Sequence, residues 1–234
     1  MSQLIMLDDN NTIFPPANLA LSEPNGLLAI GGDLTTERLI SAYKQGIFPW
    51  YNDDDPILWW SPDPRCVFFT DQFYTSKSFK KFLKKSPFKI TLNQQFKQVI
   101  AHCTLPREKQ DGTWINTNMM QAYNQLHQEG VAHSIEVWHN ETLVGGLYGL
   151  FINNVFCGES MFSLEANASK QALYTLCQFL SAHGVKMIDS QVENDHLLSL
   201  GAQSIPRVDF LNHLKSSSTS NISIDWSSRE LCHD

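Results

Sequence analysis

Residues 134–192 combine strand-like and helix-like patterns in an order that few folds accommodate. Three segments are strand-like, with short turns between them, and the first alternates apolar and polar residues as a half-buried strand does. The expected strands are Ser134–Trp138, Leu143–Phe151 and Val155–Phe162. Residues 167–183 then repeat apolar side chains at helical spacing, and residues 185–192 return to a strand pattern. The sequence therefore predicts an α+β fold in which a long helix covers a mostly antiparallel sheet.

The segment spanning residues 14–65 differs in composition from the rest of the chain. It holds seven of the ten prolines and four glycines, which is typical of turns stiffened by proline. One helix is expected inside it, over Thr35–Lys44, with Asp33 as its cap. We therefore expect a small loop-rich N-terminal domain over residues 1–65 and a second, larger domain over residues 66–234.

The net charge of −7 is unevenly distributed along the chain. Residues 72–107 contain no Asp or Glu and carry +8, so the remainder carries −15. A helix capped by Ser76 or Ser78 and ended by Pro87 is expected here, and a second helix over Asn93–Cys103. The lysines of the first helix are Lys77, Lys80, Lys81, Lys84 and Lys85. A basic helix can hold a phosphate backbone, but charge alone favours a merely solvated face.

Composition excludes several classes of protein. Hydrophobic residues at 42% and charged residues at 18% favour a folded core over disorder. The longest apolar-leaning stretch, residues 142–158, is too short and too interrupted for a membrane helix, and the acidic N-terminus does not match a signal peptide. Five widely spaced cysteines without a CxxC pair argue against a disulfide framework and a zinc site. We expect a cytoplasmic protein with a loosely held tail beyond Ser216.

Three polar residues near the expected sheet are candidates for chemistry. Asp189 and Gln191 are two positions apart, so in a regular strand their side chains share a face. A carboxylate and an amide can then form a relay toward a substrate amine, although an ordinary polar strand end explains the same spacing. Glu159 is a lone acid in an apolar strand, where burial without a partner is costly. A cationic substrate and a structural Arg or Lys are equal alternatives for its partner.

Two tryptophans are candidates for binding a base. Trp50 lies among prolines and Trp114 follows a turn, and each can be a stacking platform or a core aromatic.

The sequence gives little support for a nucleophile, a metal or a cofactor. Cys157 has no nucleophile signature around it, and it is better explained as a small buried residue. The histidines show no ligand spacing and there is no Gly-rich phosphate loop. We therefore expect no metal and no cofactor.

Seven short motifs occur in a fixed order along the chain. They are Gly26–Asp33, Gly46–Trp50, Ile57–Arg65, Gly112–Ile115, His133–Trp138, Phe156–Phe162 and Ile188–Gln191. Each motif is weak alone, but the ordered set is specific. By these motifs the chain closely resembles the bacterial leucyl/phenylalanyl-tRNA–protein transferase family, over about Phe14 to Leu214.

The resemblance implies a GNAT-like acyltransferase fold for the C-terminal domain. It implies an enzyme that moves Leu or Phe, and less often Met, from aminoacyl-tRNA to the α-amino group of proteins beginning with Arg or Lys. Such transfer marks the acceptor for N-end rule degradation. The partners implied are the acceptor ends of Leu-tRNA and Phe-tRNA and the acceptor proteins, without a membrane. No cofactor is implied, because tRNA rather than coenzyme A carries the acyl group.

The resemblance also assigns roles to residues. Asp189, Gln191 and Glu159 become the catalytic candidates. Two mechanisms remain open: Asp189 polarises Gln191, or the acids only orient the amine while the tRNA 2′-hydroxyl assists. Trp50 and Trp114 would pack on the 3′ adenosine and the aminoacyl group, and the lysine helix would hold acceptor-stem phosphates. The expected amino-acid pocket is lined by Leu147, Phe156, Leu176, Leu180 and Ile188.

Two other functions compete with this interpretation. A coenzyme A-dependent N-acyltransferase on the same fold would need a Gly-rich loop for the pyrophosphate, and the sequence has none. A non-catalytic module that binds tRNA or protein N-termini would keep the lysines and the acidic pocket. It would not need Asp189 and Gln191 together.

Overall fold

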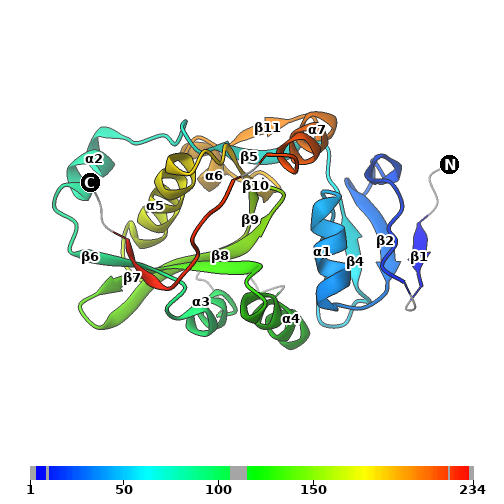
Figure 1. Cartoon of the computed structure of the whole chain (residues 1–234), viewed down its shortest axis with the longest axis horizontal. Helices are drawn as coiled ribbons and strands as arrows, with labels where there is room; N and C mark the ends of the chain where they lie inside the picture. Colours follow the sequence, from blue (N-terminus) through cyan, green and yellow to red (C-terminus); the bar gives the residue numbers. More distant parts are fainter. Residues whose placement is uncertain (1–3, 9–10, 106–114, 221, 232–234) are drawn as a thin grey trace.

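The computed structural model describes residues 4–8, 11–105, 115–220 and 222–231, and Figure 1 shows its chain path. The strands are β1 Ile5–Leu7, β2 Leu27–Gly31, β3 Phe48–Pro49, β4 Leu58–Trp60, β5 Arg65–Phe69, β6 Phe88–Leu92, β7 Ala132–His139, β8 Thr142–Ile152, β9 Val155–Ser163, β10 Met187–Gln191, β11 Gln203–Ile205 and β12 Arg229–Leu231. The helices are the 3-10 helix η1 Ala17–Leu19 and α1 Thr36–Lys44, α2 Lys77–Leu83, α3 Phe96–Cys103, α4 Thr117–Gln128, α5 Ala168–Ala182, α6 Asp195–Ser199 and α7 Arg207–Ser217. Within the described ranges, no helix has both the length and the apolar character needed to cross a membrane.

The strands form two separate sheets. The smaller has the order β1-β2-β4-β3, and the larger has the order β11-β5-β10-β9-β8-β7-β6-β12. In Figure 1 the smaller sheet and α1 lie at one end of the molecule, and the larger sheet with α5 fills the rest. The α+β class expected from the sequence is confirmed. The division into residues 1–65 and 66–234 stays a prediction, with its boundary at the first residue of β5.

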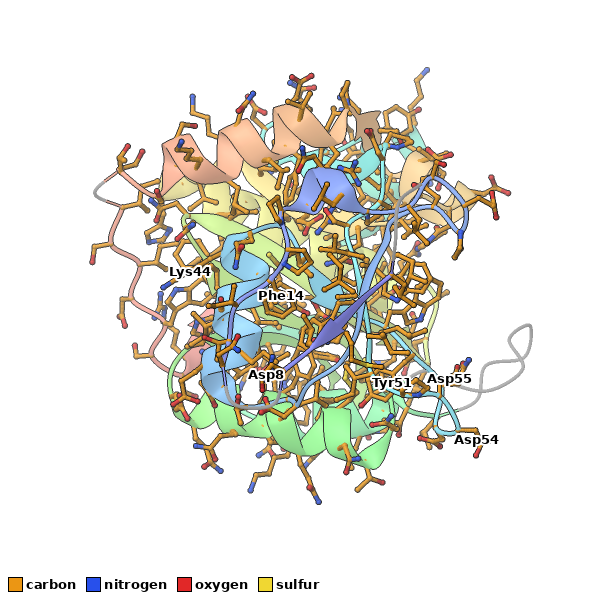
Figure 2. The ribbon with its side chains drawn as sticks, turned by 90° about the vertical axis from the view of Figure 1, so that its right-hand side faces the viewer. Asp8, Phe14, Lys44, Tyr51, Asp54 and Asp55 are labelled. Atoms are coloured by element: carbon orange, nitrogen blue, oxygen red, sulfur yellow. The ribbon has the colours of Figure 1, made fainter. Side chains whose placement is uncertain are left out.

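Aromatic packing holds the segment between β1 and β2 against the smaller sheet. The rings of Phe14 and Trp59 meet edge to face at 4.8 Å between centroids, and both are buried. The indole N–H of Trp59 donates to the carbonyl oxygen of Gly31 at 2.9 Å. Figure 2 looks onto this end of the molecule, with Phe14 near the centre and Asp54 and Asp55 at the rim. The proline-rich segment therefore builds a packed layer around its aromatic residues.

The hairpins of the larger sheet are those the sequence predicts. Asn153 and Asn154 connect β8 to β9 with φ of 51° and 58°, which are the left-handed values that a two-residue type I′ turn requires. Asn140, with φ of 53°, turns β7 into β8. Strand β10 pairs in parallel with β9, and α5 provides the crossover that parallel pairing requires.

The apolar core is continuous between the two sheets. Leu39 and Tyr43 of α1 belong to the same buried cluster as Tyr123 of α4 and Tyr148 of β8. A second cluster fills the space between α5 and the larger sheet. The predicted inner face of α5 is confirmed, because Leu173, Leu176, Cys177 and Leu180 are all buried. Helix α1 thus joins the smaller sheet to the larger one.

Two predicted helix starts are wrong. The cap of α1 is Thr35, whereas the Asp33 carboxylate accepts from the Thr35 N–H and from Arg38 Nε at 3.0 Å each. Helix α3 begins at Phe96, three residues later than expected, because Asn93 has φ of 54° and exchanges hydrogen bonds with the backbone of Ser134. These bonds to β7 hold Asn93 in a left-handed conformation, which a right-handed helix does not contain, so the helix begins after it. The predicted Ser76 cap of α2 is confirmed by its bond from the Phe79 N–H.

The expectation of a loosely held tail is wrong. Asn154 Nδ2 donates to the carbonyl oxygens of Ser217 and Ser220 at 2.7 and 2.9 Å. Strand β12 then pairs with β6 at the edge of the larger sheet. The apolar residues between these points pack against the core beside α5. Spaced Ile and Trp residues within a polar stretch fix the tail through tertiary contacts, which composition does not reveal.

Candidate active site

The site lies where two parallel strands separate. Strands β9 and β10 pair at only two positions, Phe156 with Ile188 and Cys157 with Asp189. Beyond them each strand has an irregularity. The β8–β9 register shifts so that Glu159 has no cross-strand partner, and the β5–β10 register shifts around Ser190 in the same way. A β-bulge changes the direction of its side chains, and here Glu159 and Ser190 both face the opening between β9 and β10.

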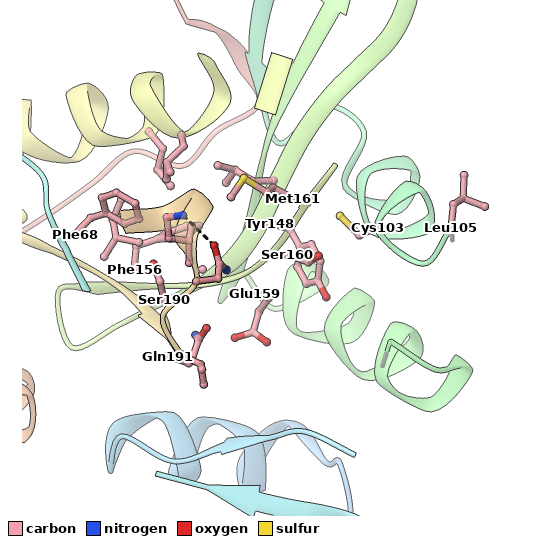
Figure 3. A pocket seen from close by; sticks show the side chains of 18 residues that line it. Phe68, Cys103, Leu105, Tyr148, Phe156, Glu159, Ser160, Met161, Ser190 and Gln191 are labelled. Carbon is pink, nitrogen blue, oxygen red and sulfur yellow. Dashed lines mark hydrogen bonds between the residues drawn. The ribbon is translucent and has the colours of Figure 1, made fainter. Parts of the chain in front are cut away.

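A cavity of ≈ 230 Å³ opens at this split (Figure 3). Its inner wall is apolar and comes from β5, β8, β9, α5, β10 and α6. The apolar residues here are Phe68, Leu147, Phe156, Met161, Leu173, Leu176, Ile188 and Leu197. The solvent-facing part of its lining, the mouth, is mostly polar, with Glu159, Ser160, Ser190, Gln191 and Asn194 beside the exposed Leu105 and Val192. The cavity therefore suits an apolar side chain attached to a polar reacting group.

Four of the five predicted pocket residues line the cavity. They are Leu147, Phe156, Leu176 and Ile188. Leu180 does not line it: the residue is fully buried in the core, one turn beyond Leu176 along α5. The helical spacing places Leu176 and Leu180 on one face, but the cavity ends before the second of them.

Glu159 is held by two tyrosine hydroxyls. Tyr43 of α1 donates to Oε1 at 2.7 Å, and Tyr123 of α4 donates to Oε2 at 3.0 Å. The two hydroxyl oxygens are 2.5 Å apart. Burial raises the pKa of Glu159 to about 7, and the tyrosine bonds oppose this rise. The structural partner of Glu159 is thus a tyrosine pair rather than the Arg or Lys considered from the sequence.

Asp189 is buried in an ion pair with Arg65. Nε and Nη2 of Arg65 each lie 2.7 Å from one carboxylate oxygen. Arg65 Nη1 donates to the Gly46 carbonyl, and its guanidinium carbon lies 4.9 Å from the ring centroid of Phe48 and 4.5 Å from that of Phe210. Burial alone would lower the pKa of Arg65, but the Asp189 carboxylate outweighs it and raises that pKa above its usual value. The carboxylate of Asp189 is therefore committed to a charge partner.

The predicted side-chain relay between Asp189 and Gln191 is wrong in its geometry. Ser190 is the extra residue of the bulge, and Gln191 has φ of 57°. The backbone N–H of Gln191 donates to Asp189 Oδ1 at 3.1 Å, and its side-chain amide donates to the Asp189 backbone carbonyl at 3.4 Å. Asp189 thus turns inward while Gln191 lines the cavity mouth (Figure 3). The period-two rule fails because the strand is not regular.

Trp50 is exposed at the surface beside Trp60. Its side chain is 42% exposed, and its ring lies 5.8 Å from that of Trp60. The indole N–H of Trp60 donates to the Trp50 carbonyl, which fixes the backbone beneath the ring. The structure does not bring Trp50 into the lining of the cavity. Trp114, the other predicted platform, lies outside the described residues.

The five predicted lysines all lie exposed on or just after α2. Phe79 anchors the inner face of this helix against Tyr174 of α5, with ring centroids 6.0 Å apart. Figure 1 shows α2 at the end of the molecule opposite the smaller sheet. The lysines are therefore spatially separate from Trp50, with the cavity on the elements between them.

No group of three or more His, Cys, Asp or Glu side chains suited to a metal ion occurs in the described part of the chain. Four cysteines there are free and buried: Cys66, Cys103, Cys157 and Cys177. Burial raises the pKa of the Cys157 thiol well above its usual value, so it stays protonated. A cysteine nucleophile is therefore disfavoured.

Three residues of the site have no role in the sequence interpretation: Tyr43, Tyr123 and Arg65. Tyr123 sits on α4, which the sequence analysis does not predict, although Asn116 followed by Met119, Tyr123 and Leu126 is a capped helical pattern. The signal for Arg65 is a single arginine that opens the apolar strand Arg65–Phe69. For Tyr43, helical spacing indicates only the apolar face of its helix.

Two family models match the chain. One, described as leucyl/phenylalanyl-tRNA protein transferase, covers residues 67–215, and the model of that protein's N-terminal domain covers residues 32–63. A leucyl/phenylalanyl-tRNA–protein transferase of Shewanella baltica is 55% identical over 234 residues, which is 99% of this chain and 98% of the relative. One of Shewanella piezotolerans is 58% identical over 215 residues, or 92% and 91% of the two chains.

These matches define a transferase. More narrowly, the chain belongs to the leucyl/phenylalanyl-tRNA protein transferase family. Among solved structures, L-PGS from Bacillus licheniformis aligns with 71% of this chain and 53% of its own, at 11% identity and a TM-score of 0.38. That score is too low to add to the argument.

Proposed function

We propose that this protein transfers Leu or Phe, and less efficiently Met, from aminoacyl-tRNA to the α-amino group of proteins beginning with Arg or Lys. One observation carries the proposal: an apolar cavity ends at a polar mouth that holds Glu159 and Gln191. The side chain of the aminoacyl group fits the apolar wall, which leaves its ester at the mouth. A methyl branch at Cβ would clash with this wall, and such steric selection is worth about 1–3 kcal/mol.

The reaction needs no cofactor. The neutral amine nitrogen attacks the ester carbonyl carbon, a C–N bond forms, and the C–O bond to the tRNA 3′-oxygen breaks. One amine proton must reach that leaving oxygen. A free α-amine has a pKa of about 7.7–8.0, so a useful fraction is neutral near pH 7.5. Most of the enzyme's task is to position the amine and move this proton.

Glu159 and Gln191 suit these tasks. A carboxyl with a pKa of about 7 can accept a proton from the amine and return it to the leaving oxygen. The side-chain amide of Gln191 donates to the Asp189 backbone, so its carbonyl oxygen is available to accept an amine N–H. Asp189 acts as a positioning residue through the Gln191 backbone. The negative charge of Glu159 also suits an acceptor whose first residue is basic.

The tRNA would be held mainly through its phosphates. The α2 lysines provide a cluster of positive charge for the acceptor stem, and Trp50 provides a face for the terminal adenosine. Contacts of this kind read the backbone and the acceptor end rather than the tRNA sequence. Because aminoacyl-tRNA is found in the cytoplasm, we place the reaction there, where transfer would mark acceptors for N-end rule degradation.

The test is transfer of radiolabelled leucine from Leu-tRNA to a peptide beginning with Arg, beside one beginning with Gly. We expect product with the Arg peptide alone, and a rate at least about 100-fold lower for Gln191→Ala. Gln203→Ala, which removes an exposed amide on β11, is the matched control and should retain the wild-type rate. Labelled acetyl-coenzyme A as donor should give no product. If tRNA binds but neither peptide is labelled, the protein is a binding module instead.

A further inference from the structure

The ring of Phe156 forms part of the apolar wall of the cavity, and its position is set from two sides. Beneath it lies Gly149 of β8, where a Cβ would come within 2.6 Å of the Phe156 ring. The absence of a side chain at Gly149 therefore lets the ring lie directly on the sheet. Beside it lies Trp226 of the C-terminal tail, with ring centroids 6.2 Å apart and planes inclined by 30°.

Trp226 is itself fixed on several sides. It stacks on His133 of β7 at 3.8 Å between ring centroids, with planes inclined by only 8°. Its ring also contacts Phe151 at 5.3 Å and Phe179 at 5.4 Å. Burial lowers the pKa of His133 to about 3, so the imidazole is a neutral ring at physiological pH. The indole therefore sits in a defined aromatic cluster and cannot shift freely.

The backbone of Trp226 is clamped as well. Asn93 Nδ2 donates to the Trp226 carbonyl at 2.8 Å and lies 3.0 Å from His133 Nδ1. The Asn93 carbonyl oxygen accepts from the Ser134 N–H at 2.8 Å. One amide side chain thus ties the tail to β7. Asn93 makes these bonds from a left-handed backbone conformation, three residues before α3 begins.

We propose that Trp226 is a positioning residue for the amino-acid pocket. By supporting Phe156, it sets the width of the pocket and hence the preference between leucine and phenylalanine. This inference rests on the proposed function. It assigns specificity to a segment beyond residue 215, where the match to the transferase family model ends.

Trp226→Ala would leave a cavity behind Phe156, into which that ring can retreat. The pocket would widen, so the larger substrate should gain relative to the smaller. The measurement is kcat/KM for Phe-tRNA divided by kcat/KM for Leu-tRNA. We expect this ratio to rise by about threefold or more, because the ring regains only part of the roughly 10- to 200-fold that one carbon atom produces in a hydrophobic pocket. Trp226→Phe keeps a ring on His133 and should shift the ratio less, in the same direction.

Leu231→Ala is the control for a purely structural role. Leu231 is also a tail residue packed on the core, but it pairs with Ile90 in β12–β6, four strand positions from β9. It should lower the melting temperature without changing the ratio. Combining Trp226→Ala with Phe156→Leu should change the ratio no further than Phe156→Leu alone, because both act through one ring. A ratio within twofold of wild type for Trp226→Ala would overturn the proposal.

A second readout separates this inference from the proposed function. Calorimetry with non-hydrolysable leucyl and phenylalanyl amides of adenosine reports the pocket whether or not transfer occurs. The Trp226→Ala protein should bind the phenylalanyl compound better, relative to the leucyl one, than wild type does. Equal relative affinities in the two proteins would reject the role of Trp226 even if the wild type transfers leucine. Altered relative affinities without any transfer would support the pocket and reject the reaction.

Discussion

Arg65 and Asp189 bind each other through two hydrogen bonds of 2.7 Å, with neither side chain exposed. A bidentate pair of this kind leaves the carboxylate little capacity for a substrate. Its remaining contact that bears on the site is the N–H of Gln191, a residue that does line the cavity. Asp189 therefore supports the site from the protein interior, while Gln191 and Glu159 line the cavity itself.

Asp189→Ala should destabilise the protein as well as inactivate it. It would leave the buried guanidinium of Arg65 without its charge partner, which costs about 3–5 kcal/mol of the free energy of unfolding. Urea unfolding measures this. Gln191→Ala should lose activity with nearly wild-type stability. The double variant Arg65→Met with Asp189→Ala should recover much of the stability but not the activity. If the Asp189→Ala variant had the same free energy of unfolding as the wild type, the assigned role would be contradicted.

Glu159 should make stability fall as pH rises from 4.5 to 7. Burial raises its pKa from 4.5 to about 7 in the folded protein, so the folded state binds the proton more tightly than the unfolded chain does. Stability is then lost as pH rises through this window and is level above it. Relative to wild type, Glu159→Gln should gain about 2–3 kcal/mol between pH 4.5 and pH 8, measured by urea unfolding. Glu23→Gln, which removes a carboxylate at an exposed position, is the matched control.

Tyr43→Phe should move the pH dependence of transfer upward. The Tyr43 hydroxyl bond favours the ionised form of Glu159, so its removal should raise the pKa of that carboxyl further. The measurement is kcat/KM against pH, where the lower midpoint should shift to higher pH. Tyr174→Phe is a suitable control, because that ring packs on Phe73 and Phe79 away from the site. An unchanged midpoint would mean that Glu159 ionisation does not govern the rate.

Trp50→Ala should weaken aminoacyl-tRNA binding without unfolding the protein. Stacking of one base on an aromatic ring is worth about 1–3 kcal/mol, so KM should rise by roughly 5- to 150-fold. The ring is 42% exposed, and its removal should leave the melting temperature almost unchanged. By contrast, Trp59→Ala removes a fully buried ring and should lower the melting temperature strongly. Wild-type KM for Trp50→Ala would remove this platform from the proposal.

Replacing the α2 lysines with glutamine should reduce the salt dependence of tRNA binding. For every lysine that binds a phosphate, its replacement should reduce the slope of log K against log salt concentration by about 0.7–0.9. Filter binding of tRNA over a series of salt concentrations gives this slope. Lys44→Gln and Lys215→Gln, exposed on α1 and α7, serve as controls and should retain it. If the α2 variants and the control variants had equal slopes, the α2 lysines would not bind phosphates and would serve only as a solvated face.

The regular parts of the fold were predictable because local patterns determine them. The hairpin at Asn153-Asn154 follows from two residues that tolerate left-handed backbone, and the buried face of α5 follows from helical spacing. The same reasoning failed at Asp189 and Gln191. A bulge at Ser190 breaks the two-residue period of the strand, and the residue types there do not predict a bulge.

The contacts of the site were less predictable, since they join residues far apart in sequence. Tyr43 and Glu159 are separated by 116 positions, and Arg65 and Asp189 by 124. A single sequence does not state which distant side chains will meet. Leu180 shows the complementary limit: its pattern correctly predicts burial, but a pattern does not say where a cavity stops.

The two opposed bulges make chain length, as much as residue type, a determinant of the site. Removing one residue from either strand would restore regular pairing and turn the side chains that follow to the other face of the sheet. Such a deletion could leave Glu159 and Gln191 in the sequence and still place their side chains on different faces of the sheet. Variation in this part of the protein is therefore expected to proceed by substitution, while insertions and deletions collect in the loops.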